Sequence, residues 1–221
     1  MKYFIDTEFA EEPCRIELIS LAIVAEDGRE FYAESSDFKD EIANDWVKKN
    51  VLPKLWHRQT DKSKYNVWIR DGGVGGLMKK QEIGGAVRRF IACDKPEFWG
   101  WFADYDWVVF CWLFGAMVDL PKGWPMYCRD IKQWADQLGG IPLPDQTSDE
   151  HHALLDARWN KKAFEYLQKG KELTCPECGA YAYIESHSPA SDHPECSTDR
   201  LQCEVCDWHS DEWPSAGGDL E

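Results

Sequence analysis

The order of the strand-like and helix-like segments is the feature that most constrains the fold of this chain. Residues 2–9, 18–25 and 30–34 carry the short apolar runs of strands, and Asp27-Gly28 is the turn signal of a hairpin. Helical segments then alternate with single short strands. Three antiparallel strands followed by this alternation predict an α/β fold, built on a sheet of mixed direction and flanked by helices.

The later part of the chain is mainly helical. Apolar spacing predicts helices over residues 45–55, 82–92, 105–117, 130–138 and 148–168, strands over residues 97–102 and 125–128, and a flexible glycine-rich loop over residues 71–76. The composition changes near Lys171, after which two CxxC pairs and many Ser, Pro and Asp residues follow. We therefore predict two domains, residues 1–170 and residues 171–221.

Charge is distributed unevenly along the chain. The 40 acidic and 25 basic residues give a net charge of −15, and a protein this acidic should repel nucleic acid as a whole. Residues 171–221, however, carry −10 of that charge, whereas residues 44–95 carry +7. The total charge therefore does not exclude nucleic-acid binding by the first domain.

The basic stretch contains the candidate nucleic-acid contacts. Lys and Arg side chains neutralise phosphates, and the Trp and Tyr residues interleaved with them can stack on unpaired bases. For any single residue, the solvated face of a helix is the competing interpretation. As a group, the predicted nucleic-acid-binding residues are Arg58, Lys79, Lys80, Arg88 and Arg89.

A pair of carboxylates lies at the end of the first apolar strand. Asp6 and Glu8 are two residues apart, so that both side chains face the same side of the strand. Carboxylates placed side by side do not both ionise readily unless a cation lies between them. Because Phe4-Ile5 and Phe9 flank the pair, a Mg²⁺ or Mn²⁺ site is favoured over a solvated strand face.

Two further acidic motifs lie later in the chain. Asp104 and Asp106 follow a predicted strand at the start of a strongly apolar helix. Asp104 fits a helix-capping role, which leaves Asp106 for a second function, with Asp104 as the alternative. His151 and His152 precede Asp156 by five and four residues on a predicted helix, so that either imidazole can lie near whatever Asp156 binds.

Together the three motifs resemble those of the DEDD superfamily of 3′–5′ exonucleases, in its histidine subclass (DEDDh). The first motif, D-x-E, is Asp6-Thr7-Glu8-Phe9, the second is Tyr105-Asp106, and the third is His151-His152-Ala153-Leu154-Leu155-Asp156. The resemblance covers roughly residues 1–168 and implies an RNase H-like fold. Within the superfamily, the chain most resembles the compact mycobacterial poly(A)-directed exoribonuclease family.

The resemblance implies phosphodiester hydrolysis with two metal ions. Asp6, Glu8, Asp106 and Asp156 would hold two Mg²⁺ or Mn²⁺ ions, and a histidine would take a proton from the attacking water. The family spacing puts this base five residues before the last Asp, at His151. His152 occupies the position that a tyrosine takes in another subclass, and it remains the alternative.

The cysteines of the last fifty residues form the strongest single motif. Four thiolates can close a tetrahedral Zn²⁺ site, and the two CxxC pairs resemble those of a small zinc ribbon. A ligand from His187, His193 or Cys196 is the alternative. The predicted ligands of one structural Zn²⁺ are Cys175, Cys178, Cys203 and Cys206.

These features predict a metal-dependent 3′–5′ exoribonuclease acting on single-stranded RNA. A DNA exonuclease of the same mechanism is the first alternative, and a non-catalytic adaptor on a degenerate nuclease fold is the second. The presence of all four carboxylates and a histidine argues against the adaptor. A zinc-dependent enzyme at the ribbon is disfavoured, because a four-cysteine site leaves no open coordination position.

Location and partners follow from what the chain lacks. No apolar run reaches the roughly 18–20 residues that cross a bilayer, and the first residues do not form a secretion signal. We therefore expect a cytoplasmic protein without membrane contact. Its expected partners are RNA or DNA 3′ ends, and both a homodimer and a protein partner at the zinc ribbon remain open.

Overall fold

A computed structural model of the protein describes residues 1–59, 73–138, 143–146, 150–172, 175, 177–178, 182–187, 198–203 and 205–206. The chain divides into two compact units, residues 1–132 with 144–164 and residues 133–143 with 165–221. The predicted start of the last helix at Ser148 lies outside the described residues. The helices in the described ranges do not combine the length and apolar character that crossing a membrane requires.

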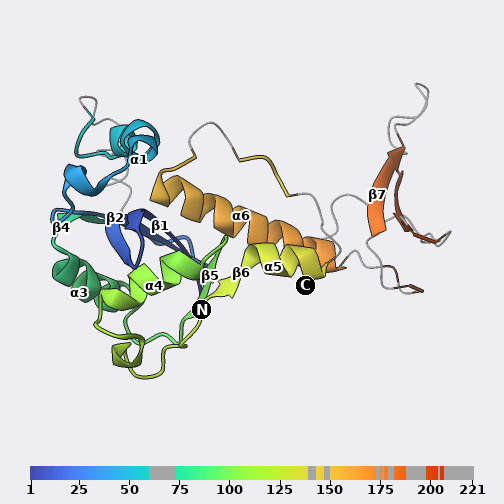
Figure 1. Ribbon diagram of the computed structural model, residues 1–221. Coiled ribbons are helices and arrows are strands. Elements are labelled where there is room, and N and C mark those ends of the chain that lie inside the picture. The colour runs from blue at the N-terminus through green and yellow to red at the C-terminus, as the bar shows by residue number, and fades with distance from the viewer. Residues whose placement is uncertain are drawn as a thin grey trace. The chain divides into compact units, whose positions relative to one another are not determined.

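A mixed six-stranded sheet organises the first unit (Figure 1). Its spatial order is β4-β3-β2-β1-β5-β6, with β1, β2 and β3 antiparallel and with β5 and β6 parallel to β1. The prediction of three antiparallel strands followed by parallel ones is confirmed. The strands are β1 Lys2–Glu12, β2 Arg15–Ala25, β3 Glu30–Ser35, β4 Val74–Met78, β5 Glu97–Gly100 and β6 Arg129–Asp130.

Helices follow or separate these strands. The α-helices are α1 Asp45–Asn50, α3 Lys80–Ile91, α4 Asp104–Trp112, α5 Ile131–Gln137 and α6 Ala153–Glu172, and the short 3₁₀ helices are η1 Asp40–Ile42, η2 Leu52–Lys54 and η3 Met117–Asp119. In the second unit, β7 Ala182–His187 and β8 Thr198–Cys203 form an antiparallel pair. Mixed strand direction with flanking helices is the predicted fold class.

The helix predicted over residues 45–55 is shorter than expected. The α-helix ends at Asn50, and a 3₁₀ turn that contains Pro53 follows it. Proline has no backbone N–H and its ring clashes with the preceding turn, so it does not continue an α-helix. The chain therefore bends here, and this bend brings η2 close to the site described below.

The loop predicted over residues 71–76 is partly wrong, because β4 begins at Val74 and pairs in parallel with β3. A Cβ atom on Gly75 would lie 1.8 Å from the carbonyl oxygen of Tyr32, and Gly75 has a φ of +135°. Only glycine allows this conformation and this close approach of two strands. A glycine-rich run was thus compatible with an edge strand as well as with a loop.

The side chains of β1 alternate between two layers of helices. Tyr3 and Ile5 are fully buried in a cluster with α3 and α4. Phe4 faces the other side and packs on Phe164 of α6, with ring centroids 5.2 Å apart. Figure 1 shows α3 and α4 on one side of the sheet and the first part of α6 on the other. By the same alternation, Asp6 and Glu8 lie on the α6 side.

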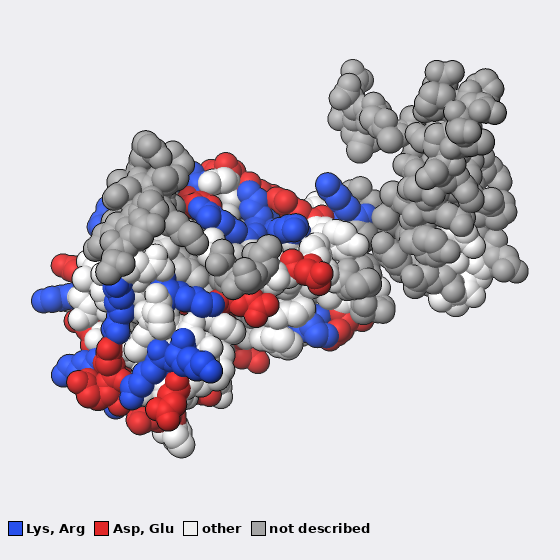
Figure 2. Space-filling view, turned by 90° about the horizontal axis from the view of Figure 1, so that it is seen from above, with Lys and Arg blue, Asp and Glu red and all other residues white. Residues whose placement is uncertain are grey.

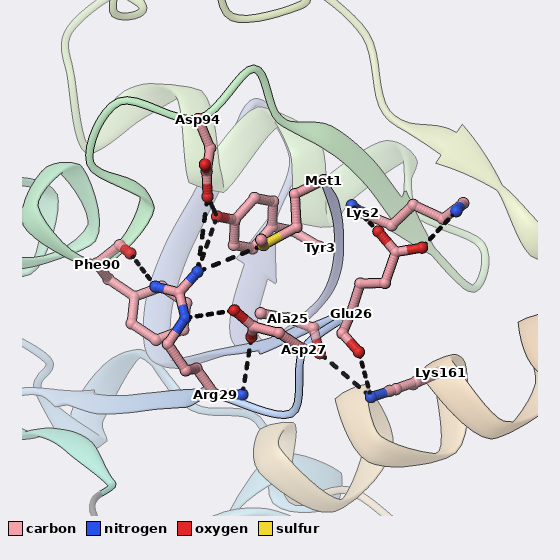
Figure 3. Close-up of polar contacts among 10 residues, drawn as sticks. All are labelled: Met1, Lys2, Tyr3, Ala25, Glu26, Asp27, Arg29, Phe90, Asp94 and Lys161. Atoms are coloured by element: carbon pink, nitrogen blue, oxygen red, sulfur yellow. Dashed lines mark hydrogen bonds and ion pairs between the residues drawn. The ribbon is translucent and has the colours of Figure 1, made fainter.

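The turn between β2 and β3 ties the sheet to helices on both sides (Figure 3). The Arg29 guanidinium donates to the carbonyl oxygen of Phe90, in the last turn of α3, at 2.8 Å. The Lys161 ammonium of α6 donates to the carbonyl oxygens of Ala25 and Glu26, at 3.3 and 3.0 Å. Because α6 also carries Asp156, the contacts of Lys161 help to fix the position of α6, and with it that of the carboxylate, relative to the strands.

Candidate active site

Three carboxylates from distant parts of the chain meet at one point. Asp6 and Glu8 come from β1 and Asp156 comes from the first turn of α6. One oxygen of each lies within 4.8 Å of the others. The pairing of β1 with β2 shifts register between Glu8 and Phe9, and such bulges are common beside functional sites because they redirect side chains.

A buried amide fixes α6 against β1 at this point. The Asn160 side chain is 1% exposed and donates to the carbonyl oxygen of Ile5 at 2.9 Å. Asn160 lies one helical turn after Asp156, and Ile5 directly precedes Asp6. The hydrogen bond therefore sets the distance between the two carboxylates.

Asp106, the predicted fourth carboxylate, is held differently. It is buried at the start of α4, where its Oδ1 accepts hydrogen bonds from the Thr7 amide at 2.8 Å and the Thr7 hydroxyl at 2.5 Å. Its oxygens are outside the compact group of three, although its charge raises the pKa of Asp6. Asp104, the alternative, is exposed. The geometry favours Asp106.

The four carboxyl groups hold protons more tightly than usual. Burial raises the pKa of Asp6 and of Glu8 well above the ordinary value, and the neighbouring carboxylates raise it further. Burial also raises the pKa of Asp156 to about 6, and that of Asp106 to about 6 despite the hydrogen bonds from Thr7. Four neighbouring acidic groups are costly to ionise together unless a cation offsets their repulsion. Because divalent cations bind carboxylate oxygens, the cluster suits such an ion.

One cation of the chain already lies beside these carboxylates. The ammonium of Lys54, in η2, lowers the pKa of both Glu8 and Asp156 against the effect of burial. The same ammonium donates to the carbonyl oxygen of Glu150. The composition of the basic stretch pointed to a general phosphate-binding role, whereas the structure puts this lysine at the carboxylate cluster itself.

The two adjacent histidines occupy different environments. His152 is 5% exposed and stacks on Tyr32, with centroids 4.8 Å apart and an angle of 25° between the rings. Its second aromatic neighbour is Trp56, at 4.9 Å. His151 is partly exposed and contacts Trp46 edge to face at 4.8 Å. Only His151 therefore combines proximity to Asp156 with access to solvent.

Backbone groups from the same turn support Asp156. The amide of His152 donates to Asp156 Oδ2 at 3.1 Å, and the amides of His151 and His152 lower the pKa of the Asp156 carboxyl relative to the effect of burial alone. His151 has a φ of +66°, which is uncommon for a residue with a side chain. The unusual conformation directs these amides toward the carboxylate and separates the two imidazoles.

Two of the predicted nucleic-acid contacts form ion pairs within the protein. Arg58 donates to both carboxylate oxygens of Asp40, at 2.7 and 2.5 Å, and Lys80 donates to Glu17 at 2.5 Å. Figure 2 shows Lys and Arg side chains interspersed with Asp and Glu on the face in view, among the residues described. These pairings reduce the positive charge available to a phosphate.

The other predicted contacts belong to α3 or precede it. Lys79 is exposed at the N-cap, and Arg88 and Arg89 are exposed in the last turn, where the Arg88 guanidinium lies 5.4 Å from the centre of the Phe114 ring. Because α3 packs on the side of Tyr3, these residues are on the opposite side of the sheet from the carboxylate pair. Their role in nucleic-acid binding stays a prediction.

Aromatic side chains adjoin the carboxylates. Phe9 follows Glu8 and Tyr105 precedes Asp106, and their rings meet edge to face at 5.8 Å. The Tyr105 side chain is half exposed. An exposed aromatic ring next to a cation site offers a flat apolar surface to a ligand that carries both a ring and negative charge.

The second unit contains a cluster of four sulfur atoms. The Sγ atoms of Cys175 and Cys206 are 3.6 Å apart, and those of Cys178 and Cys203 are 3.5 Å apart. A tetrahedral ion with bonds of about 2.3 Å to sulfur separates its ligands by about 3.8 Å. The cluster therefore fits one ion of the size of Zn²⁺. The alternative ligands His193 and Cys196 lie outside the described residues.

The thiol of Cys203 is prepared for ionisation. Burial opposes its charge, but the amides of Cys206 and Val205 donate to its Sγ at 3.4 and 3.3 Å, and together with the other thiols they lower the pKa of Cys203 to about 6. A thiolate rather than a thiol is the form that binds a metal ion. The N–H···S contacts are thus an independent argument for a metal site.

Sequence reasoning alone misses Thr7 and Asn160. Thr7 points to the opposite side of β1 from Asp6 and Glu8. Its hydrogen bond to Asp106, 99 residues away, is therefore not visible in the local sequence pattern. Asn160 carries a usable signal, because it lies four residues after Asp156 and therefore on the same face of the helix. A polar residue one helical turn after a candidate ligand is therefore itself a candidate site residue.

Replacement of Asp156 by Asn should stabilise the protein when no Mg²⁺ or Mn²⁺ is added. The folded-state pKa of about 6 exceeds the ordinary 3.8. The contribution of this carboxyl to stability is therefore complete below pH 4 and is lost as the pH rises through 6. Thermal unfolding between pH 5 and 8 should show a gain for Asp156→Asn that grows with pH, to about 3 kcal/mol at most.

The exposed carboxylate of Asp104 provides the control for this measurement. Asp104→Asn removes a negative charge from the same end of the sheet without removing a buried one. We expect its unfolding temperature to follow the wild type across the pH range. A gain for Asp156→Asn that does not change with pH would contradict the assignment of a raised pKa.

Comparison with known proteins gives an independent result for the first unit. A family described as the 3′-5′ exoribonuclease Rv2179c-like domain matches residues 1–168. Two Mycobacterium tuberculosis proteins are each 37% identical to this chain over 170 residues, 76% of this chain and 93% of the relative: 3′-5′ exoribonuclease Rv2179c of strain ATCC 25618/H37Rv and 3′-5′ exoribonuclease MT2234.1 of strain CDC 1551/Oshkosh.

Solved structures of Escherichia coli exonuclease I are also similar. A zinc-bound complex with single-stranded DNA matches with a TM-score of 0.42 at 12% identity, and a complex with a dA16 oligonucleotide matches with a TM-score of 0.40 at 13% identity. Both matches cover 91% of this chain and 54% of the other. The chain thus spans about half the length of those exonucleases.

Proposed function

The chain belongs to the family of the 3′-5′ exoribonuclease Rv2179c-like domain, and on this basis we propose that it removes nucleotides from the 3′ end of single-stranded RNA by a two-metal-ion mechanism. The family and the named relatives make the chain a 3′–5′ exonuclease that depends on divalent metal ions. The match includes 93% of each M. tuberculosis relative, so that nearly the whole length of both proteins has a counterpart here.

The meeting of three carboxylates is the observation that carries the proposal. Oxygens of Asp6, Glu8 and Asp156 lie within 4.8 Å of one another, with Glu8 buried and both aspartates half-buried, and the pKa of each carboxyl group is raised. Two Mg²⁺ or Mn²⁺ ions would be held by these three groups together with Asp106. When bound, such ions activate water and stabilise the negative charge that develops on the leaving 3′ oxygen.

His151 is the proposed general base. Its imidazole is partly exposed, and its backbone amide lies beside the Asp156 carboxylate, which supports the assignment of the solvent-accessible histidine as the base. The imidazole would take the proton from this water as it attacks phosphorus. His152 is enclosed by Tyr32 and Trp56, which supports a structural role for the second histidine.

RNA is the proposed substrate and DNA of the same polarity is the alternative. The exposed Tyr105 ring beside Asp106 suits the stacking of an unpaired base. The five basic residues 58, 79, 80, 88 and 89 remain proposed phosphate contacts outside the cluster. A non-catalytic adaptor is the least favoured function, because all four carboxylates and His151 are retained.

Matched oligonucleotides decide between the two substrates. Single-stranded RNA and DNA of one sequence, each labelled at the 5′ end, would be incubated separately with the protein and Mn²⁺ and followed over time. We expect RNA to shorten at least 10-fold faster than DNA. Equal rates would contradict a preference for RNA, and faster shortening of DNA would make DNA the substrate; either result leaves the mechanism intact.

One structural Zn²⁺ is proposed for the four-cysteine cluster. A four-thiolate site is closed and so supports folding rather than catalysis. Metal analysis of the purified full-length protein should find one zinc per chain. Cys203→Ser should lose it, whereas Cys93→Ser, which changes an exposed cysteine of the first unit, should retain it. Full zinc content in Cys203→Ser would contradict the site.

We propose that residues 1–170 form the exonuclease domain and residues 171–221 form the zinc ribbon. With a charge of −10, the ribbon suits a structural or protein-docking role better than RNA contact. A homodimer, a protein partner at the ribbon and a cytoplasmic location complete the proposal. Reducing conditions there favour zinc binding over disulfide formation by paired cysteines.

A further inference from the structure

The turn that carries His151 is held by a distant segment of the chain. Residues 44–56, which contain α1 and η2, contact this turn at three successive residues. The Trp46 ring meets the His151 imidazole edge to face, with centroids 4.8 Å apart and an angle of 79° between the planes. An edge-to-face contact at this distance restricts the rotation of the smaller ring.

Backbone contact adds to the ring contact. The Lys54 ammonium donates to the carbonyl oxygen of Glu150, the residue before His151. Lys54 itself is well placed, because Leu52 and Leu55 on either side of it are buried in a cluster that includes Val47 of α1. The backbone that carries Lys54 is therefore held by packed apolar side chains.

The conformation of His151 needs such support. Its φ of +66° lies in the left-handed region, which is uncommon for residues other than glycine. Contacts with the surrounding structure help to hold a residue in such a conformation. On the other side of the turn, Trp56 packs on His152 at 4.9 Å. Contacts from one segment thus hold the residue before His151, the imidazole itself and the residue after it.

A buried carboxylate fastens this segment to the sheet. Glu34 of β3 is 3% exposed and accepts hydrogen bonds from the amides of Trp56, at 2.6 Å, and His57, at 3.1 Å. It also accepts from the Tyr32 hydroxyl at 2.6 Å. Within the segment, the Asn44 side chain caps α1 by accepting from the Val47 amide at 2.9 Å. The cap stabilises α1, and Glu34 anchors the end of the segment to the sheet.

We propose that Trp46 is a positioning residue for His151, and that its indole fixes the orientation in which the imidazole accepts a proton from water. The inference rests on the proposed role of His151 as general base. The indole does not touch the reacting atoms in this account. Its effect is to keep the ring nitrogen aimed at one place, on a turn that Lys54 holds through the carbonyl oxygen of Glu150 and Trp56 through the ring of His152.

A competing role for Trp46 has a different kinetic signature. The Trp46 side chain is 52% exposed, so that its free face is also available to the terminal base of a substrate. Loss of a stacking surface weakens substrate binding and raises KM, whereas loss of a positioning contact lowers kcat at unchanged KM. The two roles are therefore separable with the same variant.

The test compares Trp46→Ala and Trp46→Phe with Trp112→Ala in the full-length protein, on 5′-labelled RNA with saturating Mn²⁺. Trp112 in α4 has an exposure of 53%, which matches that of Trp46. We expect Trp46→Ala to lower kcat by roughly 10- to 100-fold, because small misplacements of a reacting group have effects of this size. KM and the affinity for Mn²⁺ should stay within about 2-fold.

Trp46→Phe supplies the rescue that a purely structural effect would not show. The smaller aromatic ring preserves the edge contact and should restore kcat to within about 3-fold of wild type. Trp112→Ala should have the wild-type kcat. A wild-type kcat in Trp46→Ala, or a rise in KM without a fall in kcat, would overturn the positioning role.

The same series separates this inference from the proposed function. In a His151→Ala background, Trp46→Ala should have no further effect on the residual rate, because the group that it positions is absent. A further 10-fold fall in that background would overturn the inference. Wild-type activity in His151→Ala alone would instead contradict the base assignment of the proposed function.

Discussion

Asp6→Asn should lower the Mn²⁺-dependent rate of RNA shortening by roughly 10³-fold or more, because a metal ligand is worth several kcal/mol to the transition state. The change preserves the shape of the side chain but removes the charge that binds the ion. Asp6 is part of the compact group with Glu8 and Asp156. Titration with Mn²⁺ should show weaker binding in parallel with the loss of rate.

Asp104→Asn is the matched control for this prediction. Asp104 and Asp106 belong to the same helical turn, but only Asp106 is buried and bonded to Thr7. We expect Asp104→Asn to keep the wild-type rate and Asp106→Asn to lose most of it. The reverse order would make Asp104 the fourth metal carboxylate. An active Asp6→Asn would remove the cluster from the mechanism altogether.

His151→Ala should lower kcat by about 10²- to 10⁴-fold at saturating Mn²⁺, the range that general-base catalysis supplies. Binding of Mn²⁺ should change little, since the proposed ligands are carboxylates. The rate would be measured with 5′-labelled RNA at several concentrations, so that kcat and KM are obtained separately. Added imidazole should recover part of the rate, because it replaces the missing base.

His152→Ala is the adjacent comparison and should affect stability instead. The ring is 5% exposed between Tyr32 and Trp56, and its removal leaves a cavity that costs roughly 2 kcal/mol or more. Thermal unfolding should shift downward while kcat, measured below the unfolding transition, falls only a few-fold. A large loss of kcat in His152→Ala with an active His151→Ala would exchange the two roles.

Local sequence pattern predicted β1, β2, β3 and the carboxylate pair because they depend on short-range periodicity, whereas it missed β4 and predicted a strand over residues 125–128, just before the observed β6. Asp6 and Glu8 share a face of β1 through the simple alternation of a strand. The parallel strand β5 and the helix α3 were likewise visible as apolar runs and a helical spacing. These elements are stabilised by the same apolar side chains that form the pattern.

Features that depend on contacts distant in sequence could not be predicted in this way. The pattern favoured His151 over His152 but did not reveal that Tyr32 and Trp56 enclose the His152 ring. The expected capping role of Asp104 favoured Asp106 as the ligand, but the sequence did not reveal the hydrogen bond from Thr7 that distinguishes the two residues. Each of these contacts joins residues from separate elements.

The basic stretch illustrates the same limit. Counting charges along residues 44–95 gave +7 and suggested a nucleic-acid path. In the structure, Arg58 pairs with Asp40 and Lys80 with Glu17, partners that lie outside the stretch. Lys54 instead lies at the carboxylate cluster. The net charge of a stretch of sequence therefore does not give the electrostatic potential at the surface, because that potential also depends on acidic partners from other parts of the chain.

The release of a terminal label tests the central claim most directly. RNA labelled either at its 3′ end or at its 5′ end would be incubated with the protein and Mn²⁺, and free labelled mononucleotide would be measured from the first turnover. The account predicts that the 3′ label is released first, and that Asp6→Asn does not release it. Earlier release of the 5′ label, or release by Asp6→Asn at the wild-type rate, would contradict it.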